Sequence, residues 1–366
     1  MSINQQDVNA QIANKLGSGS EAALATPVAT PALSQNAGWH EDTINEGILS
    51  TIGNTPLVRL KRLLQDSQFE LYAKLEAFNP GGSVKDRAAI KILEHALEKG
   101  DIKPGGTIVE SSSGNMGIGL AQACAYLGIR LLCVVDPKTT SQNIEIMKAY
   151  GAEIDLVREP HPLTGEYLHA RIERVKELVA SMKNAFWPDQ YANLNNPRAH
   201  HRTMSEVVSA LGGEVDYFFC ATSTCGTVRG CAEYCREKKL ATKIVAVDAV
   251  GSVIFGGEPA KRLIPGHGAA VRPNLYEPWI GERVVKVTDL DCVVGCRRLV
   301  KWEAILAGGS SGAVLTAVDS MKHEIPRGAV CVALLADRGE RYLDTIYRDS
   351  WVHEHFGDVS HLWQEQ

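Results

Sequence analysis

Short apolar runs alternate with amphipathic stretches along the chain from residue 41 onward. Runs typical of buried β-strands occupy residues 70–76, 107–113, 130–136, 153–157, 215–222, 243–250 and 329–336. Residues 86–99, 116–127 and 143–150 carry apolar side chains at helical spacing, and Gly100 and Gly151 end two of these helices. This alternation predicts an α/β fold with open, parallel-rich sheets flanked by helices. The number of strand–helix repeats indicates two such units.

The domain organisation follows from where this alternation starts and stops. Residues 1–40 are rich in Ala, Ser, Pro, Gln and Asn and show no apolar period, which predicts a disordered tail. The chain of 366 residues is long enough for two medium domains. We predict a large domain from residues 41–87 and 198–350, a small mobile domain at 88–197, and a C-terminal tail at 351–366 that packs on a neighbour or frays.

Composition removes several classes of function. The net charge of −5 comes without a basic run, so we expect no nucleic-acid partner. No apolar stretch reaches the roughly 18–20 residues that span a bilayer, and the N-terminus lacks the basic and apolar regions of a signal peptide.

Nine cysteines, an odd number, then predict reduced thiols in a cytoplasmic protein. Cys231 and Cys235, like Cys292 and Cys296, have no histidine at ligand spacing beside them, so we expect helix-face residues and no metal site.

The segment 79–88, NPGGSVKDRA, contains the most informative lysine. A Pro-Gly-Gly turn ends a strand and a helix starts just after Ser83, which puts Lys85 in the first helical turn. An ammonium group is unfavourable there because it meets the positive end of the helix dipole. A lysine that forms an imine with an aldehyde carries its charge differently and is a known nucleophile. Taken alone, the segment leaves a solvated lysine at a helix start as the alternative.

Two segments carry a resemblance to a known family. Residues 79–89, NPGGSVKDRAA, resemble the Schiff-base motif of fold-type II pyridoxal-5′-phosphate (PLP) enzymes, the group of cysteine synthase and cystathionine β-synthase. Residues 51–60, TIGNTPLVRL, resemble the opening signature of that family, and the similarity continues in order to about residue 350. The resemblance implies a two-domain fold like that of the tryptophan synthase β-subunit, with PLP between the domains. It also implies that Lys85 is the Schiff-base lysine and that the protein is a homodimer.

The segment 111–117, SSSGNMG, follows a predicted strand and opens a helix, a position at which backbone N–H groups bind anions. In the family the equivalent loop binds the substrate α-carboxylate. The resemblance implies that Asn115 contacts the PLP ring oxygen and that Ser112, Ser113 and Met116 line the carboxylate. Met116 replaces the usual threonine, so only its backbone N–H can serve.

Residues 223–227, STCGT, resemble the GTGGT loop that binds the PLP phosphate in the family. The phosphate ligands implied are Ser223, Thr224, Cys225, Gly226 and Thr227. Small residues, hydroxyl donors and a helix N-terminus keep the chemistry of that loop although two glycines are replaced. We expect Cys225 to be a small filler rather than a nucleophile.

Gln190, in the segment QYANLNNP, matches a glutamine that is a second ligand of the substrate carboxylate in the family. Asn193, Asn196 and His200 follow in the same frame, and loop and helix-cap roles suit these three better.

The segment 336–342, ADRGERY, resembles the family's segment beside the pyridine nitrogen, where cysteine synthases place a serine. Counting along the segment puts Arg338 at that position, directly after Asp337. A cation there would oppose protonation of the ring, although β-elimination needs only a modest electron sink. In the alternative, Arg338 turns away and leaves Ser310 or Ser311 nearby, so this contact stays open.

The reaction implied by the resemblance is β-replacement on a serine-derived amino acid. Lys85 removes the Cα proton, the β-leaving group departs to give an α-aminoacrylate, and a nucleophile adds. The loops 111–117 and 223–227, residues 248–257 and DRGERYLD look like those of O-phosphoserine-dependent synthases of 2,3-diaminopropionate precursors. Those enzymes join O-phospho-L-serine to the amino group of L-glutamate for siderophore or antibiotic biosynthesis. The products are N-(2-amino-2-carboxyethyl)-L-glutamate and phosphate.

A phosphorylated substrate should require cations near the site. Arg198, Arg229 and Lys148 are candidates by position, and each also fits the role of a solvated helix charge. Three other functions remain open: a cysteine synthase that uses O-acetyl- or O-phosphoserine with sulfide, a serine or threonine dehydratase-like lyase, and a PLP-fold protein that binds a partner enzyme without turnover.

Overall fold

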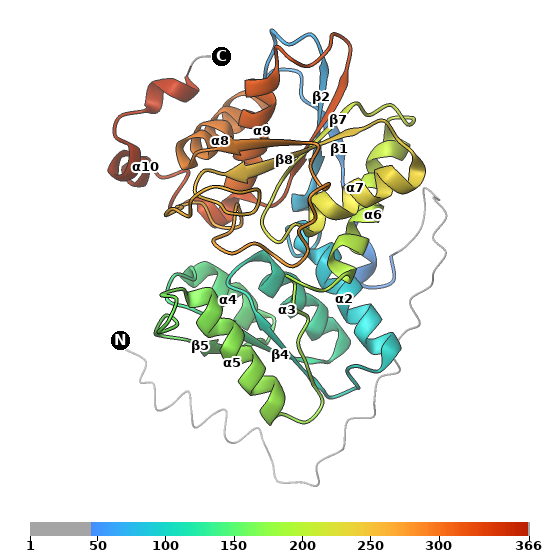
Figure 1. The fold of residues 1–366 in the computed structure, drawn as a ribbon, viewed down its shortest axis with the longest axis vertical. Helices are drawn as coiled ribbons and strands as arrows, with labels where there is room; N and C mark the ends of the chain where they lie inside the picture. Colours follow the sequence, from blue (N-terminus) through green and yellow to red (C-terminus); the bar gives the residue numbers. More distant parts are fainter. Residues whose placement is uncertain (1–44, 365–366) are drawn as a thin grey trace, which may run out of the picture. The chain divides into compact units, whose positions relative to one another are not determined.

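The computed structural model describes residues 45–364, and the tail predicted at 1–40 lies outside this range. The described residues form two sheets (Figure 1). The larger sheet has the strand order β1 (Leu57–Arg59), β2 (Glu70–Leu75), β10 (Val330–Leu335), β7 (Tyr217–Ala221), β8 (Lys243–Ala249) and β9 (Arg283–Val287). The smaller sheet has the order β5 (Glu153–Leu156), β4 (Arg130–Val135), β3 (Thr107–Ser111) and β6 (Ala185–Phe186). All pairs are parallel except β1 with β2.

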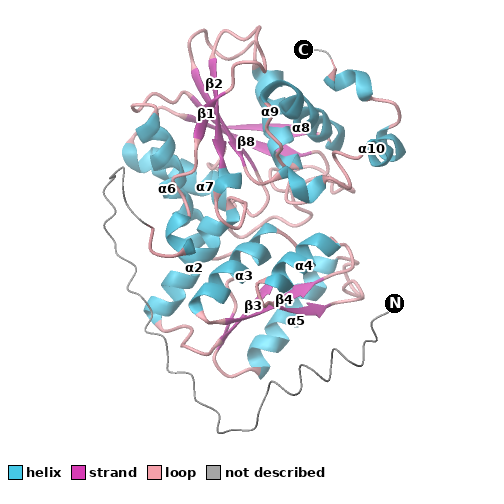
Figure 2. Ribbon diagram, turned by 180° about the vertical axis from the view of Figure 1, so that it is seen from behind, coloured by secondary structure: helices cyan, strands magenta, loops and turns pink. Residues whose placement is uncertain are grey.

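Helices flank both sheets (Figure 2). The α-helices are α2 (Lys85–Lys99), α3 (Asn115–Leu127), α4 (Ser141–Ala149), α5 (Tyr167–Ser181), α6 (Asn195–Ala210), α7 (Gly226–Lys238), α8 (Asp289–Glu303), α9 (Gly309–Met321) and α10 (Asp349–Phe356). Short 3-10 helices are η1 (Ile48–Thr51), η2 (Glu76–Phe78), η3 (Gly339–Tyr342) and η4 (Ser360–Trp363). The predicted α/β fold is confirmed, and the predicted strands and helices end within two residues of those observed.

The smaller sheet is buried on both faces because its strands are apolar at successive positions. Val109 and Val134 face α5, where they pack with Val175. Ile108 and Cys133 point to the opposite face and join the core formed with α2 and α3. Successive strand residues point to opposite faces, so continuous apolar runs are what a two-sided sheet requires.

The larger sheet follows the same rule. Phe219 of β7 lies in the core with α8 and α9, whereas the adjacent Phe218 packs on the other face against α6 and α7. The chain connections place five loops at the carboxyl ends of β2, β3, β7, β8 and β10. Ligands of open α/β sheets bind at these ends.

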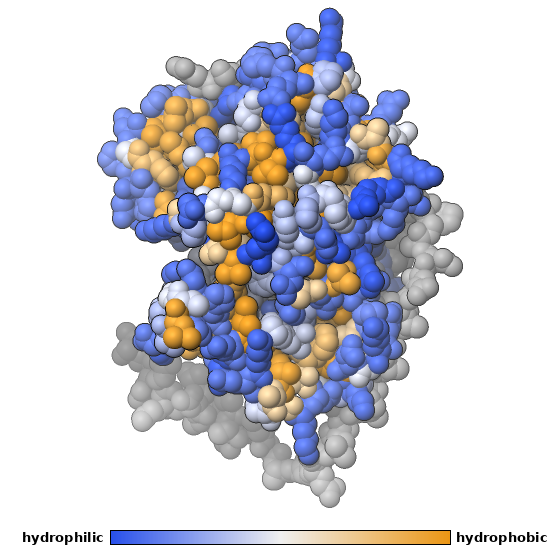
Figure 3. All heavy atoms as spheres, in the orientation of Figure 1, coloured by the Kyte–Doolittle hydropathy of each residue, from blue (hydrophilic) through white to orange (hydrophobic). Residues whose placement is uncertain are grey.

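The C-terminal segment is helical up to residue 363. Trp351 and Phe356 of α10 and Trp363 of η4 are partly buried against the core of the larger sheet. Lys301 of α8 donates a 2.6 Å hydrogen bond to the carbonyl of Gln364. Figure 3 shows apolar surface in this region of the molecule, among polar side chains. The predicted tail therefore packs on its own chain as far as the structure describes it. Over residues 45–364, no helix combines the length and the apolar character needed to span a bilayer.

Candidate active site

The turn before Lys85 is shaped by a buried carboxylate. Gly81 donates its backbone N–H to Oδ2 of Asp86 at 2.6 Å, and Asp86 is only 1% exposed. A Cβ added to Gly81 would strike this carboxylate, and Gly82 has a φ of +86°. Both glycines are thus required by the geometry of the turn. Burial raises the pKa of Asp86 to about 7.

Lys85 is the first residue of α2, and its backbone N–H lies 3.2 Å from Oγ of Ser83. Burial lowers the pKa of its ammonium group, and the charge of Asp337 partly opposes this change. Cys225 is a further neighbour of the amine, so the amine lies near both the 223–227 loop and the end of β10. A lysine with a lowered pKa has more free amine at neutral pH, the form that attacks an aldehyde.

The 111–117 segment turns from β3 into α3 as predicted. Oγ of Ser112 accepts the backbone N–H of Gly117 at 2.8 Å, which fixes the loop on the helix that follows. Met116 is the second residue of α3 with its side chain 2% exposed, so its thioether packs in the core of the smaller sheet. The backbone remains the part of Met116 that can meet a ligand.

Gln190 reaches the same loop from a distant part of the chain. Its Nε2 donates to the carbonyl of Ser111 at 3.3 Å, and its side chain is buried. Nδ2 of Asn143 donates to the carbonyl of Ser113 at 3.0 Å. The four residues predicted to bind the substrate carboxylate, Ser112, Ser113, Met116 and Gln190, therefore gather at the end of β3.

The 223–227 loop lies at the N-terminus of α7. Cys225 precedes the helix with a φ of +67°, a conformation that L-residues rarely adopt. Gly226 leaves room for Asn196, because a Cβ there would strike the Asn196 amide. Nδ2 of Asn196 donates to Oγ1 of Thr224 at 3.2 Å and to the carbonyl of Gln190 at 2.7 Å. Asn196 therefore connects this loop to the segment that carries Gln190.

His200 supports the other end of the loop. Its Nε2 lies 3.3 Å from Oγ1 of Thr227 and its Nδ1 lies 3.2 Å from Oγ1 of Thr203. Burial, and then the charge of Lys85, lower the pKa of His200 well below its usual value. The imidazole is therefore neutral and orients the Thr227 hydroxyl. Burial raises the pKa of Cys225 to about 12, so its thiol stays protonated, as a filler requires.

Asn115 is fixed at both ends of its amide. Its Nδ2 donates to Oδ2 of Asp337 at 2.7 Å, and its Oδ1 accepts from Arg341. Arg341 also donates to the carbonyl of Gly81, so it joins the start of α3 to the turn before Lys85. Oη of Tyr342 donates to the same Asp337 oxygen at 2.6 Å. The amide orientation is unambiguous because a carboxylate only accepts and a guanidinium only donates hydrogen bonds.

Arg338 lies apart from this group. Its side chain is exposed, and its Nε donates to the carbonyl of Ala77 at 2.9 Å. Asp337, one residue earlier, is 1% exposed. Ser310 and Ser311 are buried in the first turn of α9. Oγ of Ser311 accepts a 3.1 Å hydrogen bond from the backbone N–H of Ala336, the residue before Asp337. The predicted pyridine contact of Arg338 stays a prediction, and the structure offers Asp337 and the two serines at the same strand end.

The three cations proposed for a substrate phosphate have other environments. Arg229 pairs with Glu233 at 2.7 Å, and Lys148 pairs with Glu145 at 3.0 Å on an exposed helix face. Arg198 is exposed, and its Nη1 lies 3.3 Å from Oδ1 of a neighbouring asparagine. Within residues 45–364, none of these three side chains forms a hydrogen bond or ion pair with the loops described above, although Arg229 acts on Cys225 electrostatically.

Two other arginines are better placed. Arg341 and Arg262 are partly buried, and neither pairs with a carboxylate within residues 45–364. Arg262 lies in the loop after β8 with its Nε buried and unpartnered, and Nη1 lies 3.4 Å from the carbonyl of His267. Burial lowers the pKa of Arg262, and its neighbours Asp248, Asp289 and Glu166 oppose this change, followed by Tyr191, the residue after Gln190. Sequence reasoning missed both arginines, and for Arg341 the reason is that its partners, Asn115 and Gly81, come from distant segments.

Sequence reasoning also gave no role to Asp337 and only structural roles to Asn196 and His200. The spacing of Asn196 and His200 by four residues places them on one face of α6, a signal that both meet the same neighbour. For Asp337, the available signal was an acidic residue directly after a buried strand, where ligand-binding side chains gather.

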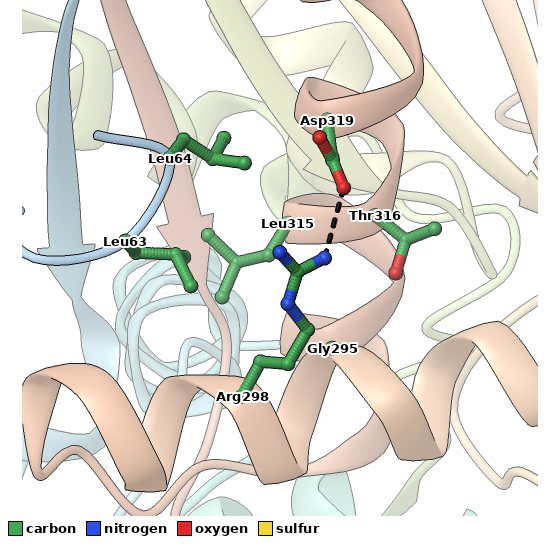
Figure 4. A pocket seen from close by; sticks show the side chains of 7 residues that line it. All are labelled: Leu63, Leu64, Gly295, Arg298, Leu315, Thr316 and Asp319. Atoms are coloured by element: carbon green, nitrogen blue, oxygen red, sulfur yellow. Dashed lines mark hydrogen bonds and ion pairs between the residues drawn. The ribbon is translucent and has the colours of Figure 1, made fainter. Parts of the chain in front are cut away.

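A small surface pocket elsewhere holds a different set of side chains (Figure 4). It lies between the β1–β2 connection and helices α8 and α9, and its lining includes Leu63, Leu64, Leu315 and Thr316. Arg298 in this pocket is neutralised by Asp319 at 2.9 Å. The pocket contains none of the predicted site residues.

Comparison with known proteins assigns the chain to a family. The model of the family described as "Pyridoxal-phosphate dependent enzyme" matches residues 48–337. The chain belongs to this family. It is accordingly a PLP-dependent enzyme of the cysteine synthase-like, β-replacement type, with PLP as its cofactor.

Solved structures of this family are similar over nearly their whole length. One is a hydrogen sulfide-producing enzyme from Fusobacterium nucleatum, with 35% identity, a TM-score of 0.77, and coverage of 82% of this chain and 100% of that chain. Another is an O-ureido-L-serine synthase, with 32% identity, a TM-score of 0.77, and coverage of 87% and 98%. A third is an O-acetylserine-dependent cystathionine β-synthase from Helicobacter pylori, with 30% identity, a TM-score of 0.77, and coverage of 84% and 100%.

The residues present fit a PLP cofactor. Buried hydroxyls of Thr224 and Thr227 and the N-terminus of α7 are suited to an anionic phosphate. Lys85, which is half-buried, supplies an amine near that loop. Asn115 supplies an amide whose orientation is fixed. These three groups fit three parts of PLP. The threonine hydroxyls suit its phosphate, the Lys85 amine suits its aldehyde, and the Asn115 amide suits its ring oxygen.

Proposed function

We propose that this enzyme joins O-phospho-L-serine to the amino group of L-glutamate, releasing phosphate and forming N-(2-amino-2-carboxyethyl)-L-glutamate, a 2,3-diaminopropionate precursor for siderophore or antibiotic biosynthesis. The loop sequences SSSGNMG, STCGT and DRGERYLD support this choice within the family. The observation that carries it is a pair of partly buried guanidinium groups, those of Arg341 and Arg262, which form no ion pair with a carboxylate among the described residues. A phosphate leaving group and a dicarboxylate nucleophile both require such cations.

The roles of the chain's own residues follow from their positions. Lys85 binds the cofactor covalently and, when freed by substrate, takes and returns the Cα proton. Backbone N–H groups of Ser113 and Met116, with Gln190, hold the substrate carboxylate at the end of β3. When bound, PLP withdraws electrons from Cα, which makes loss of the β-substituent feasible. Arg341 donates to Asn115 and to the carbonyl of Gly81, a position from which it can meet an anionic β-substituent.

The phosphate loop has a separate role. Residues 223–227 hold the cofactor through its anionic arm, with the hydroxyls of Thr224 and Thr227 fixed by Asn196 and His200. A neutral His200 can accept or donate at Thr227 without adding a charge. The loop therefore keeps its hydrogen-bonding pattern across the neutral pH range.

The decisive experiment incubates the full-length, PLP-loaded protein with O-phospho-L-serine and each nucleophile in turn. We expect phosphate release with L-glutamate and a product with the mass of the glutamate adduct. Release that depends on sulfide instead, with cysteine as product, would establish the cysteine synthase alternative. That alternative draws support from the O-acetylserine-dependent and hydrogen sulfide-producing enzymes among the similar structures. Pyruvate as the sole product would identify a dehydratase-like lyase.

Replacement of the lysine tests the chemistry independently of the substrate. Lys85→Ala should abolish turnover and the visible absorption band of the bound cofactor, because the amine of Lys85 is the one that lies near the 223–227 loop in the described part of the chain. A matched control is Lys91→Ala, which changes a lysine six residues further along α2, where its side chain is 45% exposed. Turnover retained by Lys85→Ala would refute the assignment.

We also propose that the protein acts as a cytoplasmic homodimer, by the resemblance and by its reduced cysteines, all nine of which are buried and free of disulfides. Light scattering on the purified protein measures its oligomeric state directly.

A further inference from the structure

Asp337 is buried at the centre of the site with no role in the reaction as described so far. Its backbone pairs with Ser83, two residues before Lys85, and accepts the N–H of Gly308 at 3.3 Å. A Cβ at Gly308 would strike the carboxylate, so this glycine keeps the space that Asp337 occupies. The side chain is 1% exposed. A carboxylate is held at this depth only when its hydrogen bonds and charge are compensated.

One oxygen of the carboxylate is fully engaged and the other is not. Oδ2 accepts from Asn115 at 2.7 Å and from Tyr342 at 2.6 Å. Oδ1 is buried and finds no hydrogen-bond partner within residues 45–364. An orphaned buried oxygen is costly, so its retention indicates an interaction that the protein alone does not complete.

The titratable groups around Asp337 come from four places in the fold. They are Lys85 at the start of α2, Arg341 and Tyr342 in η3, Cys296 in α8, and Tyr347 before α10. Burial raises the pKa of the Asp337 carboxyl, and the charges of Arg341 and then of Lys85 oppose this change. Among the charges that act on Lys85, that of Asp337 is the largest, and it opposes the effect of burial on the pKa of the amine.

We propose that Asp337, held in place by Tyr342, is a positioning residue of this site, which orients the amide of Asn115 and supplies the counter-charge for the Lys85 nitrogen. The proposal rests on the assignment of Lys85 and Asn115 to the cofactor and is independent of the identity of the two substrates. The carboxylate favours the positively charged form of the Lys85 nitrogen, against the effect of burial. Burial raises the pKa of the Asp337 carboxyl, and the hydrogen bonds from Tyr342 and Asn115 favour its charged form against this effect.

A pH titration of the bound cofactor's visible absorption band reports the charge on the Lys85 nitrogen without any substrate. In full-length, PLP-loaded protein, we expect Asp337→Asn to lower the apparent pKa of this transition by roughly one unit or more, the effect of removing a nearby opposite charge. Tyr342→Phe should shift it in the same direction by less, because the carboxylate loses one donor but remains. Asp344→Asn, an exposed aspartate in the same segment, is the matched control and should cause no shift.

If neither Asp337→Asn nor Tyr342→Phe moves the transition further than Asp344→Asn does, the proposal is wrong. Should Asp337→Asn fail to fold, Tyr342→Phe alone decides, since it leaves the backbone contacts of Asp337 in place. Absence of the absorption band in the unmodified protein would instead contradict the assignment of Lys85. Normal band titration without turnover of O-phosphoserine and glutamate would contradict the proposed reaction only.

Discussion

A buried network of four charges holds the helix that begins with Lys85. Arg87 donates to both oxygens of Glu76, at 2.7 and 2.8 Å, and to both oxygens of Glu206, at 2.8 and 2.7 Å. Lys74 donates to Glu206 at 2.7 Å. The four side chains are 0–6% exposed. Two positive and two negative charges thus balance in the buried part of the network, and Arg202, which is 55% exposed, adds an ion pair to Glu206 at 3.3 Å.

The substitution Glu206→Gln breaks this balance with little change of shape. Lys74 and Arg87 would then share Glu76 as their one carboxylate, leaving one buried positive charge without a partner. Removing one member of a buried ion pair costs about 3–5 kcal/mol. The pKa of Glu206 gives a second measure of this free energy. Burial raises the pKa, but Arg87 and Lys74 outweigh this effect and lower it from 4.5 to about 2. A shift of this size corresponds to about 3 kcal/mol.

Guanidinium denaturation of the full-length, PLP-loaded protein, followed by circular dichroism, measures the loss. We expect Glu206→Gln to lower the free energy of unfolding by about 3–5 kcal/mol at pH 7. The matched control is Glu153→Gln, which breaks a pair with Arg130 of the same 2.7 Å length but with side chains 54% and 58% exposed. Exposed pairs contribute about 0–1 kcal/mol, so the control should lose little.

The dependence on pH has a definite sign. Because the folded-state pKa of Glu206 is depressed, its contribution is complete above pH 4.5 and is lost as the pH falls towards 2. The deficit of Glu206→Gln should therefore shrink on acidification below pH 4.5. If Glu206→Gln lowers the free energy of unfolding at pH 7 no more than Glu153→Gln does, the argument that it leaves a buried positive charge without a partner is wrong.

Two further substitutions test a buried carboxyl group of β3 and the thiol of the 223–227 loop. Burial raises the pKa of Glu110 from 4.5 to about 8, so the folded protein holds a proton that the unfolded chain has lost, and its stability should fall as the pH rises between these values. Glu110→Gln should remove up to about 4 kcal/mol of this loss of stability with rising pH, which melting temperatures at pH 5 and pH 9 measure. If the melting temperature of Glu110→Gln changes with pH as much as that of the unmodified protein, the raised pKa of Glu110 is contradicted. Cys225→Ala should keep kcat within about threefold of the unmodified enzyme, since a protonated thiol is no nucleophile, and a loss above about a hundredfold would make it a participant.

The fold could be predicted because its signals are local. The apolar runs of β3 and β7 and the helical spacing of α2 and α3 are each contained in fewer than twenty residues. The loops at strand ends were predictable for the same reason, since a strand followed by small polar residues and a helix brings backbone N–H groups to one edge of the sheet. Prediction of the two sheets needed no knowledge of which distant segments meet.

Whether Asp337 or Arg338 is buried at the end of β10 could not be predicted from the sequence, because this depends on register. Asp337 pairs with Ser83, and the next residue, Arg338, pairs with Ala307. Neighbouring residues of an extended chain point to opposite sides, so a shift of one residue decides whether a carboxylate or a guanidinium faces the site. Counting along a loop cannot fix this register. The register is fixed by backbone hydrogen bonds to two distant segments, which involve Gly82 and Val84 in one and Leu306 and Gly308 in the other.

Helix α6 explains why stability and cofactor binding should be coupled. Its first turns carry Asn196 and His200 to the 223–227 loop, and its third turn carries Glu206 to Arg87, two residues after Lys85. One rigid element therefore sets the distance between the phosphate loop and the lysine. Glu206→Gln removes the bond at one end of this element while leaving every residue of the loop intact. It should for this reason weaken PLP binding as well as folding, whereas Glu153→Gln should affect neither.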